Sequence, residues 1–274
     1  RFTMNDYGSD GIYITPRRVG EDGWELGIKA LIDNADCSHK ARFTLIDADG
    51  NEKASAIADL RPIISAKLPV EDPVLWNGRK NPYLYTVRCE IFDSTTQEVT
   101  DNIDIRTGLR EYHIDSHKGF FLNGEHIKLQ GVSRHQDREN MGNAITEKQH
   151  AEDVKIILDV GANSVRLAHY QQNSYFYDLC DESGLLVWAE VPVISRFSPK
   201  RNENAEQQLV ELIKQNYNHP SIFCWGIENE ITIAGSASKK LITFLKHMHK
   251  VARHLDPTRY TTCAQLTMCP VNSP

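Results

Sequence analysis

The chain has 274 residues, of which 40% are hydrophobic and 25% are charged, and its formal net charge is -6. This length and apolar content suit two domains with separate cores. The acidic balance argues against a nucleic-acid partner, because nucleic-acid-binding surfaces are usually basic. No apolar run approaches the ~20 residues of a membrane span, so no membrane partner is predicted. The first residue is Arg1 and no signal-peptide pattern follows it, which leaves the cellular compartment open.

The cysteines are scattered and form neither a C-x-x-C motif nor a zinc-like spacing with histidine. A chain of this length has enough core to fold without disulfides. We therefore expect reduced thiols packed in the core at all six positions, Cys37, Cys89, Cys180, Cys224, Cys263 and Cys269.

The first hundred residues show a sequence pattern that is typical of a β-sandwich. Short runs of alternating or β-branched residues, such as Trp24–Ile28 and Tyr83–Ile91, are separated by turn signals at intervals of about 8 to 12 residues. Asp49-Gly50-Asn51 is a predicted hairpin turn. We interpret residues 11–108 as an immunoglobulin-like β-sandwich, and residues 1–10 as the linker from a preceding domain.

From about residue 119, apolar strand-like runs alternate with helix-period stretches. Near-continuous apolar strands suit a parallel sheet covered by helices, and the absence of a glycine-rich phosphate turn disfavours a nucleotide-binding sheet. We predict that residues 109–274 are the first part, about strands one to five, of a (β/α)8 TIM barrel. The expected strands are Ile127–Val132, Ser164–Leu167, Leu185–Val191, Ile222–Gly226 and Tyr260–Ala264, and the expected helices are Glu147–Leu158, Ser174–Ser183, Asn204–Asn216 and Lys239–His254.

Polar residues follow four of these strands, where barrels carry their catalytic groups. Taken singly, His135 or His169 is explained as a hydrogen-bonded structural histidine, and Arg166 as an ion-pair partner. Taken together, they indicate that the carboxyl-terminal end of the barrel carries groups for acid–base catalysis on a hydroxyl-rich ligand. The four segments are Gly131–Asp137, Arg166–Tyr170, Trp188–Glu190 and Trp225–Glu230.

These segments resemble the motifs of a known enzyme family. Asn218–Glu230 closely resembles the acid/base signature of glycoside hydrolase family 2. Asn163–Tyr170, followed by Tyr177–Leu185, is similar to a second signature of that family, and Gly131–His135 to its first-strand motif. The resemblance covers the chain from about Gly11 to its end and implies a retaining β-glycosidase.

The resemblance also implies roles for single residues. Glu230 would be the general acid/base, which protonates the leaving oxygen and then activates water. Asn229 would hydrogen-bond the sugar 2-hydroxyl, His135 and His169 would bind ring hydroxyls, and Arg166 would orient the nucleophilic carboxylate.

Weaker candidates surround these residues. Arg134 and Asp137 could belong to the same shell, and Glu228 is expected to be a supporting or a surface carboxylate. The stretch Val191–Arg196 lacks the acidic residue and the histidine that some β-galactosidases use to hold magnesium. We therefore predict no metal site and no cofactor.

Several alternatives stay open. The form of Ser133–Asp137 favours a β-galactosidase acting on β-galactosides, with β-glucuronidase and β-mannosidase as near alternatives. The chain could also be a non-catalytic carbohydrate-binding or scaffolding unit in which Glu230 is structural. The nucleophile of the family is expected beyond Pro274, so this chain alone is predicted to be inactive. The open edges of a partial barrel predict self-association, for example as a homo-oligomer.

Overall fold

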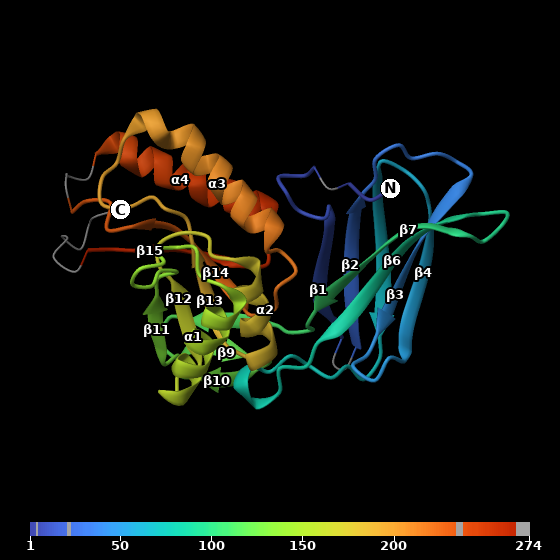
Figure 1. Ribbon diagram of the computed structural model, residues 1–274, viewed down its shortest axis with the longest axis horizontal. Helices are drawn as coiled ribbons and strands as arrows, with labels where there is room; N and C mark the ends of the chain where they lie inside the picture. Colours follow the sequence, from blue (N-terminus) through green and yellow to red (C-terminus); the bar gives the residue numbers. More distant parts are fainter. Residues whose placement is uncertain (4, 21–22, 234–237, 267–274) are drawn as a thin grey trace. The chain divides into compact units, whose positions relative to one another are not determined.

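The computed structural model describes residues 1–3, 5–20, 23–233 and 238–266. The chain forms two compact units, each described by itself (Figure 1). The first comprises Arg1–Lys128, Asp181–Gly184 and Tyr217–Pro220, and the second comprises the remainder. By these contacts, residues 109–128 group with the first unit. The predicted domain boundaries, including the linker at residues 1–10, stay a prediction.

Residues 12–107 of the first unit form two antiparallel sheets, one of three strands in the order β1-β2-β5 and one of four strands in the order β4-β3-β6-β7. This is the predicted sandwich. Its strands are β1 (Ile12–Val19), β2 (Gly23–Leu31), β3 (His39–Ile46), β4 (Glu52–Asp59), β5 (Ile63–Val70), β6 (Tyr85–Asp93) and β7 (Val99–Thr107), with a short 3₁₀ helix, η1 (Gly78–Lys80), before β6.

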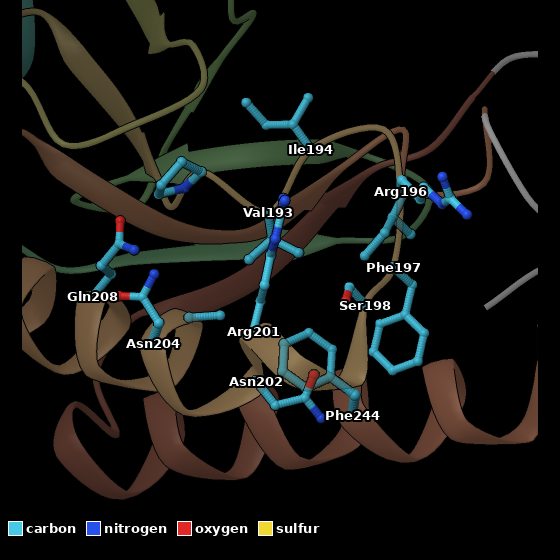
Figure 2. A pocket seen from close by; sticks show the side chains of 13 residues that line it. Val193, Ile194, Arg196, Phe197, Ser198, Arg201, Asn202, Asn204, Gln208 and Phe244 are labelled. Carbon is cyan, nitrogen blue, oxygen red and sulfur yellow. The ribbon is translucent and has the colours of Figure 1, made fainter.

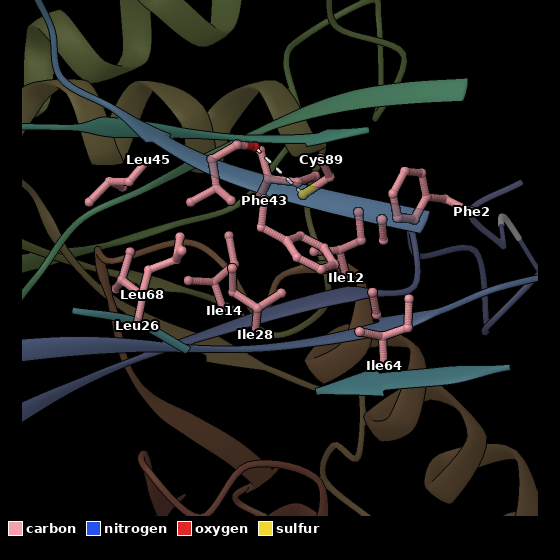
Figure 3. Close-up of a cluster of buried hydrophobic side chains, with 14 of the residues drawn as sticks. Phe2, Ile12, Ile14, Leu26, Ile28, Phe43, Leu45, Ile64, Leu68 and Cys89 are labelled. Carbon is pink, nitrogen blue, oxygen red and sulfur yellow. Dashed lines mark hydrogen bonds between the residues drawn. The ribbon is translucent and has the colours of Figure 1, made fainter. Parts of the chain in front are cut away.

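The core of the sandwich lies between the two sheets (Figure 3). Alternate residues of β2 are buried, including Trp24, Leu26 and Ile28, because successive side chains of a strand point to opposite faces. The predicted turn at Asp49-Gly50-Asn51 joins β3 to β4, and Gly50 has a φ of 86°. Alternation and turn chemistry thus fix the register of this hairpin.

The cysteines follow the prediction only in part. Cys89, Cys180 and Cys224 are buried free thiols, and the Cys89 thiol faces the Val87 carbonyl oxygen at 3.8 Å (Figure 3). Cys263 is half-buried, and Cys37 is exposed, so its expected place in the core was wrong. Cys37 lies in the polar connection before β3, between Asp36 and Ser38. Cys269 lies outside the described residues.

An antiparallel meander follows the sandwich and was not predicted. It consists of β8 (Tyr112–Asp115), β9 (Gly119–Leu122) and β10 (Glu125–Ile127), in the sheet order β10-β9-β8. The predicted strand Ile127–Val132 was therefore wrong, because Ile127 ends β10 and the first parallel strand begins only at Gly131. The overlooked signal is Asn123-Gly124, with φ of 51° and 82°, since Asn-Gly is a strong signal for a two-residue hairpin turn.

The second unit contains a parallel five-stranded sheet in the sequential order β11-β12-β13-β14-β15, as expected for the first part of a TIM barrel. Helices α3 and α4 lie side by side over it (Figure 1). None of the described helices is long and apolar enough to cross a membrane. The strands are β11 (Gly131–Arg134), β12 (Ser164–Leu167), β13 (Leu186–Glu190), β14 (Ile222–Asn229) and β15 (Tyr260–Ala264), and the helices are α1 (Glu147–Asp159), α2 (Ser174–Ser183), η2 (Pro199–Arg201), α3 (Asn202–Gln215) and α4 (Lys239–Leu255).

Strand β14 is buried along its whole length, whereas strands of the sandwich alternate. Such double-sided burial is typical of a parallel sheet that is covered on both faces. Because parallel strands end at the same edge, the polar residues after β11 to β14 gather at one rim.

Candidate active site

Arg166 on β12 and Glu190 at the end of β13 form a bidentate ion pair. Arg166 Nε donates to Glu190 Oε2 at 2.9 Å, and Arg166 Nη2 donates to Glu190 Oε1 at 2.8 Å. The Glu190 side chain is completely buried, whereas Arg166 is about one-fifth exposed. The guanidinium carbon lies 4.9 Å from the centre of the Trp188 ring, which adds a cation–π contact. Two parallel charge-assisted hydrogen bonds fix the plane of the guanidinium.

Two further predicted residues join this pair. Arg166 Nη2 also donates to Asn229 Oδ1 at 2.6 Å, and His169 Nδ1 lies 2.9 Å from Glu190 Oε1. Asn229 is buried at the end of β14. We call these four residues, Arg166, His169, Glu190 and Asn229, the rim cluster.

His135 lies beside the rim cluster. Its ring centroid is 5.1 Å from that of His169 in an edge-to-face arrangement, and its side chain is exposed. The structure therefore brings together Arg166, His169, Asn229 and His135 from the ends of three different strands.

Glu230 follows Asn229 directly and leaves the strand in an unusual backbone conformation. Its φ is 46°, in the left-handed region that few residues other than glycine adopt. Its backbone N–H donates to the Ala264 carbonyl oxygen at 2.8 Å, which ties it to the end of β15. Such conformations cost about 1–3 kcal/mol and concentrate at functional sites. The residue is half-buried at the rim, a position that suits an acid/base group.

Glu228 is a buried carboxyl group, so the alternative of a surface position was wrong. It accepts from the backbone N–H of Ile231 at 3.2 Å and from the thiol of Cys263 on β15. Burial raises the pKa of Glu228 above its ordinary value, and it also raises the pKa of Cys263, to about 12. Glu228 thus supports the turn that carries Glu230.

Arg134 contacts residues outside the rim cluster. Its buried guanidinium donates to Asp153 Oδ2 on α1 at 2.6 Å and to His150 Nδ1 at 3.0 Å, and it stacks over the Phe176 ring. Arg134 therefore anchors a helix to the sheet. Asp137, the other weak candidate, is exposed.

Sequence reasoning gave no role to Glu190, although it stood at the end of a noted strand. A charged residue closing the apolar run Leu186–Ala189 was the available signal, because a buried charge needs a partner. Gly226 was also overlooked. A Cβ there would lie 2.4 Å from Trp188 Nε1 and 2.8 Å from Glu190 Cγ, so only glycine leaves room for these side chains.

A cavity of about 240 Å³ lies next to the segment after β13 (Figure 2). Val193, Phe197 and Arg201 line it from this segment, and Phe244 from α4. The same segment is joined to the end of β14, because Asn229 N donates to Val193 O at 2.8 Å and Ser195 N donates to Asn229 O at 3.0 Å. The cavity wall and the strand that carries Asn229 are thus one continuous backbone network.

Comparison with known proteins agrees with this geometry. The family model described as "Glycosyl hydrolases family 2, TIM barrel domain" matches residues 114–272, and the one described as "Glycosyl hydrolases family 2" matches residues 10–110. A β-glucuronidase of Bacteroides fragilis is 38% identical over 94% of this chain and 39% of its own length. A β-galactosidase of Thermoanaerobacter pseudethanolicus is 30% identical over 94% of this chain and 34% of its own length.

A solved structure extends the likeness. The FMN-binding β-glucuronidase from Facaelibacterium prausnitzii L2-6 is 41% identical, with a TM-score of 0.95, over all of this chain and 42% of that protein. The chain thus spans between 34% and 42% of the length of these three relatives. The predicted fold class, an immunoglobulin-like domain followed by part of a TIM barrel, is confirmed. The chain belongs to glycoside hydrolase family 2.

Proposed function

We propose that the protein is a retaining β-glycosidase in which Glu230 is the general acid/base. The observation that carries this proposal is the position of Glu230, half-buried at the rim of a parallel sheet and next to Asn229. In the first step its carboxyl group protonates the glycosidic oxygen as the bond to the sugar breaks. In the second step its carboxylate takes a proton from the water that releases the sugar.

The other rim residues bind the sugar. Asn229 faces the sugar 2-hydroxyl, and His135 and His169 offer ring nitrogens to neighbouring hydroxyls. Arg166 holds the rim in shape and orients the nucleophile. Hydrogen bonds to the 2-hydroxyl strengthen as the oxocarbenium-like transition state forms, so they lower the barrier as well as bind.

Retention needs a second carboxylate about 5 Å from the first. Glu190 is completely buried and paired with Arg166, and Glu228 is buried in hydrogen bonds of its own. Neither is presented to a sugar. We therefore expect the nucleophile on a strand other than β13 and β14.

Two substrate classes compete. The names of several relatives, including the Bacteroides fragilis enzyme at 38% identity, favour β-glucuronides. The second candidate is the β-galactoside class, which the Ser133–Asp137 segment favours. The charge of Arg166 is already balanced by Glu190, so the rim cluster offers hydrogen-bonding groups rather than a free cation for a uronic acid. A β-glucuronidase would need a further cationic group at the sugar C6 position.

The full-length protein should be assayed on nitrophenyl β-glucuronide, β-galactoside and β-mannoside. We expect turnover of the glucuronide, with NMR showing a product of retained β-configuration. Preferred cleavage of the galactoside would move the specificity to the second class. An inverted product would refute the double-displacement mechanism, and binding without cleavage of any substrate would favour a carbohydrate-binding unit.

Glu230→Gln tests the assigned residue. We expect a loss of kcat/KM, which reports the first step, on the order of 10²–10⁴-fold for a phenyl glycoside, whose leaving group needs protonation. A dinitrophenyl glycoside, whose leaving group needs no proton, should lose far less in its first step. Equal loss on both substrates would indicate a structural role for Glu230.

A further inference from the structure

The two protons of Arg166 Nη2 are both committed. This nitrogen donates to Glu190 Oε1 at 2.8 Å and to Asn229 Oδ1 at 2.6 Å. A guanidinium Nη atom carries two N–H bonds and cannot accept. His169 Nδ1 lies 3.1 Å from the same nitrogen, but no proton is left for it.

The orientation of the Asn229 amide follows from this count. Because Arg166 Nη2 is only a donor, the amide atom facing it must be the oxygen. The Nδ2 group then points away from Arg166. Within the described ranges, no residue accepts a hydrogen bond from it. Asn229 is therefore set to donate to a ligand oxygen.

The tautomer of His169 follows from the same count. Since Arg166 does not supply a proton to Nδ1, that nitrogen carries its own and donates to Glu190 Oε1 at 2.9 Å. In this tautomer Nε2 carries no proton and can accept from a hydroxyl. The rim thus presents one donor, at Asn229, and one acceptor, at His169.

The orientation of the Asn229 amide and the tautomer of His169 both depend on the side chain of Glu190. Glu190 fixes the guanidinium plane through Nε and Nη2, which aims the remaining Nη2 proton at Asn229, and it takes the proton of His169. We propose that Glu190 is the positioning residue of this active site, which sets Asn229 as the donor to the sugar 2-hydroxyl and His169 as an acceptor. This inference rests on the proposed glycosidase function.

The surroundings keep Glu190 in place. Its side chain has no exposed area, and the missing side chain of Gly226 leaves the space that it fills. Arg166 and His169 face it with hydrogen-bond donors, while Glu228 is a further acidic group near enough to influence it. A carboxylate buried among fixed donors changes orientation little during a catalytic cycle.

Glu190→Gln removes the carboxylate and keeps the shape. The amide has a single acceptor oxygen, so in either orientation one of the two hydrogen bonds that fix the guanidinium plane of Arg166 is lost, and Nη2 is no longer aimed at Asn229. The readout is the ratio of kcat/KM for the normal glycoside to kcat/KM for its 2-deoxy analogue, measured in the full-length protein. We expect this ratio to fall about tenfold or more, because the 2-hydroxyl is no longer met by a correctly oriented donor.

Two comparisons separate positioning from general damage. Asp153→Asn breaks the neighbouring buried pair with Arg134, and it should lower stability while leaving the ratio unchanged. Asn229→Ala should abolish the preference for the 2-hydroxyl, and Glu190→Gln added to it should lower the ratio no further. An unchanged ratio in a folded Glu190→Gln variant would overturn the inference.

If Glu190→Gln does not fold, Arg166→Lys carries the test. A lysine keeps a positive charge beside Glu190 but lacks the fork that reaches Asn229 Oδ1 as well. The 2-hydroxyl preference should then fall as in Glu190→Gln, and its retention would refute the inference. Absence of glycosidase activity in the wild-type protein would instead refute the proposed function, so the two failures are distinguishable.

Discussion

The indole nitrogen of Trp225 donates to Asp256 Oδ2 at 2.9 Å in the interior of the second unit. Arg259 Nη1 donates to the same oxygen at 2.8 Å, and Arg259 Nε donates to the carbonyl oxygen of Ile222 at 2.9 Å. Trp225 and Ile222 both lie on β14, the strand that ends next to Glu230. This network therefore fixes the position of β14, the strand that leads to Glu230.

Asp256→Asn should destabilise the protein by about 3–5 kcal/mol, because it leaves the buried Arg259 charge without its partner. Urea unfolding of wild type and variant measures the difference. Asp104→Asn is the matched control, since its ion pair with Arg88 is about half exposed and should contribute less than about 1 kcal/mol. Equal effects of the two substitutions would contradict the role of the network.

Asp256 should also make the stability of the protein depend on pH. Burial opposes ionisation of Asp256, but Arg259 and the hydrogen bonds outweigh it and lower the pKa of Asp256 from 3.8 to about 2. The stabilisation is therefore fully present above pH 3.8 and is lost as the pH falls through about 2. Wild type and Asp256→Asn should converge in unfolding free energy over this window. A constant difference would contradict the assignment.

Gly226→Ala should impair the site directly. The added methyl group would meet Trp188 Nε1 at 2.4 Å and Glu190 Cγ at 2.8 Å, so both side chains must move. We expect a loss of stability of about 1–3 kcal/mol, together with a loss of activity. Gly27→Ala in β2 is the control, because its Cβ would meet nothing closer than 3.7 Å. Thermal melts and kcat/KM should show these losses for Gly226→Ala and not for Gly27→Ala, and similar values for the two variants would contradict the prediction.

Glu228→Gln should be tolerated far better than Glu190→Gln. The amide can still accept from Ile231, so the stability loss should stay below about 1 kcal/mol. Burial raises the pKa of Glu228, which means that the folded state binds more protons than the unfolded one. Wild-type stability should therefore fall relative to Glu228→Gln as the pH rises above 4.5. A rise in relative stability would contradict this sign.

Hydrophobic periodicity was sufficient to predict most of the second unit. The strands Ser164–Leu167 and Tyr260–Ala264 and the helix Ser174–Ser183 have the predicted bounds, because the apolar runs are clear there and Gly184 closes the helix. The meander at residues 112–127 was missed because its strands are too short to show a period, although its Asn-Gly turn was visible.

Three of the four residues of the rim cluster were predicted as site residues, but Glu190 and the organisation of the cluster were not. Strand ends identified Arg166, His169 and Asn229, since parallel strands bring their ends together. The contacts of Glu190 with both Arg166 and His169 depend on side-chain rotamers and on the space left at Gly226. These are properties of the packed structure. For the same reason, the sequence left Arg134 as a weaker candidate for the site, whereas the structure shows that its guanidinium contacts Asp153 on α1.

The sequential strand order of the parallel sheet has a consequence for biosynthesis. Each strand from β12 onward pairs with the strand made just before it, so the sheet can grow as the chain leaves the ribosome. Arg166 and Glu190 are synthesised before Asn229 and Glu230, and their pairing requires only β12 and β13. Glu230, the proposed acid/base residue, can therefore arrive at a rim in which Glu190 is already paired with Arg166, which spares the nascent protein an unpaired buried carboxylate during translation.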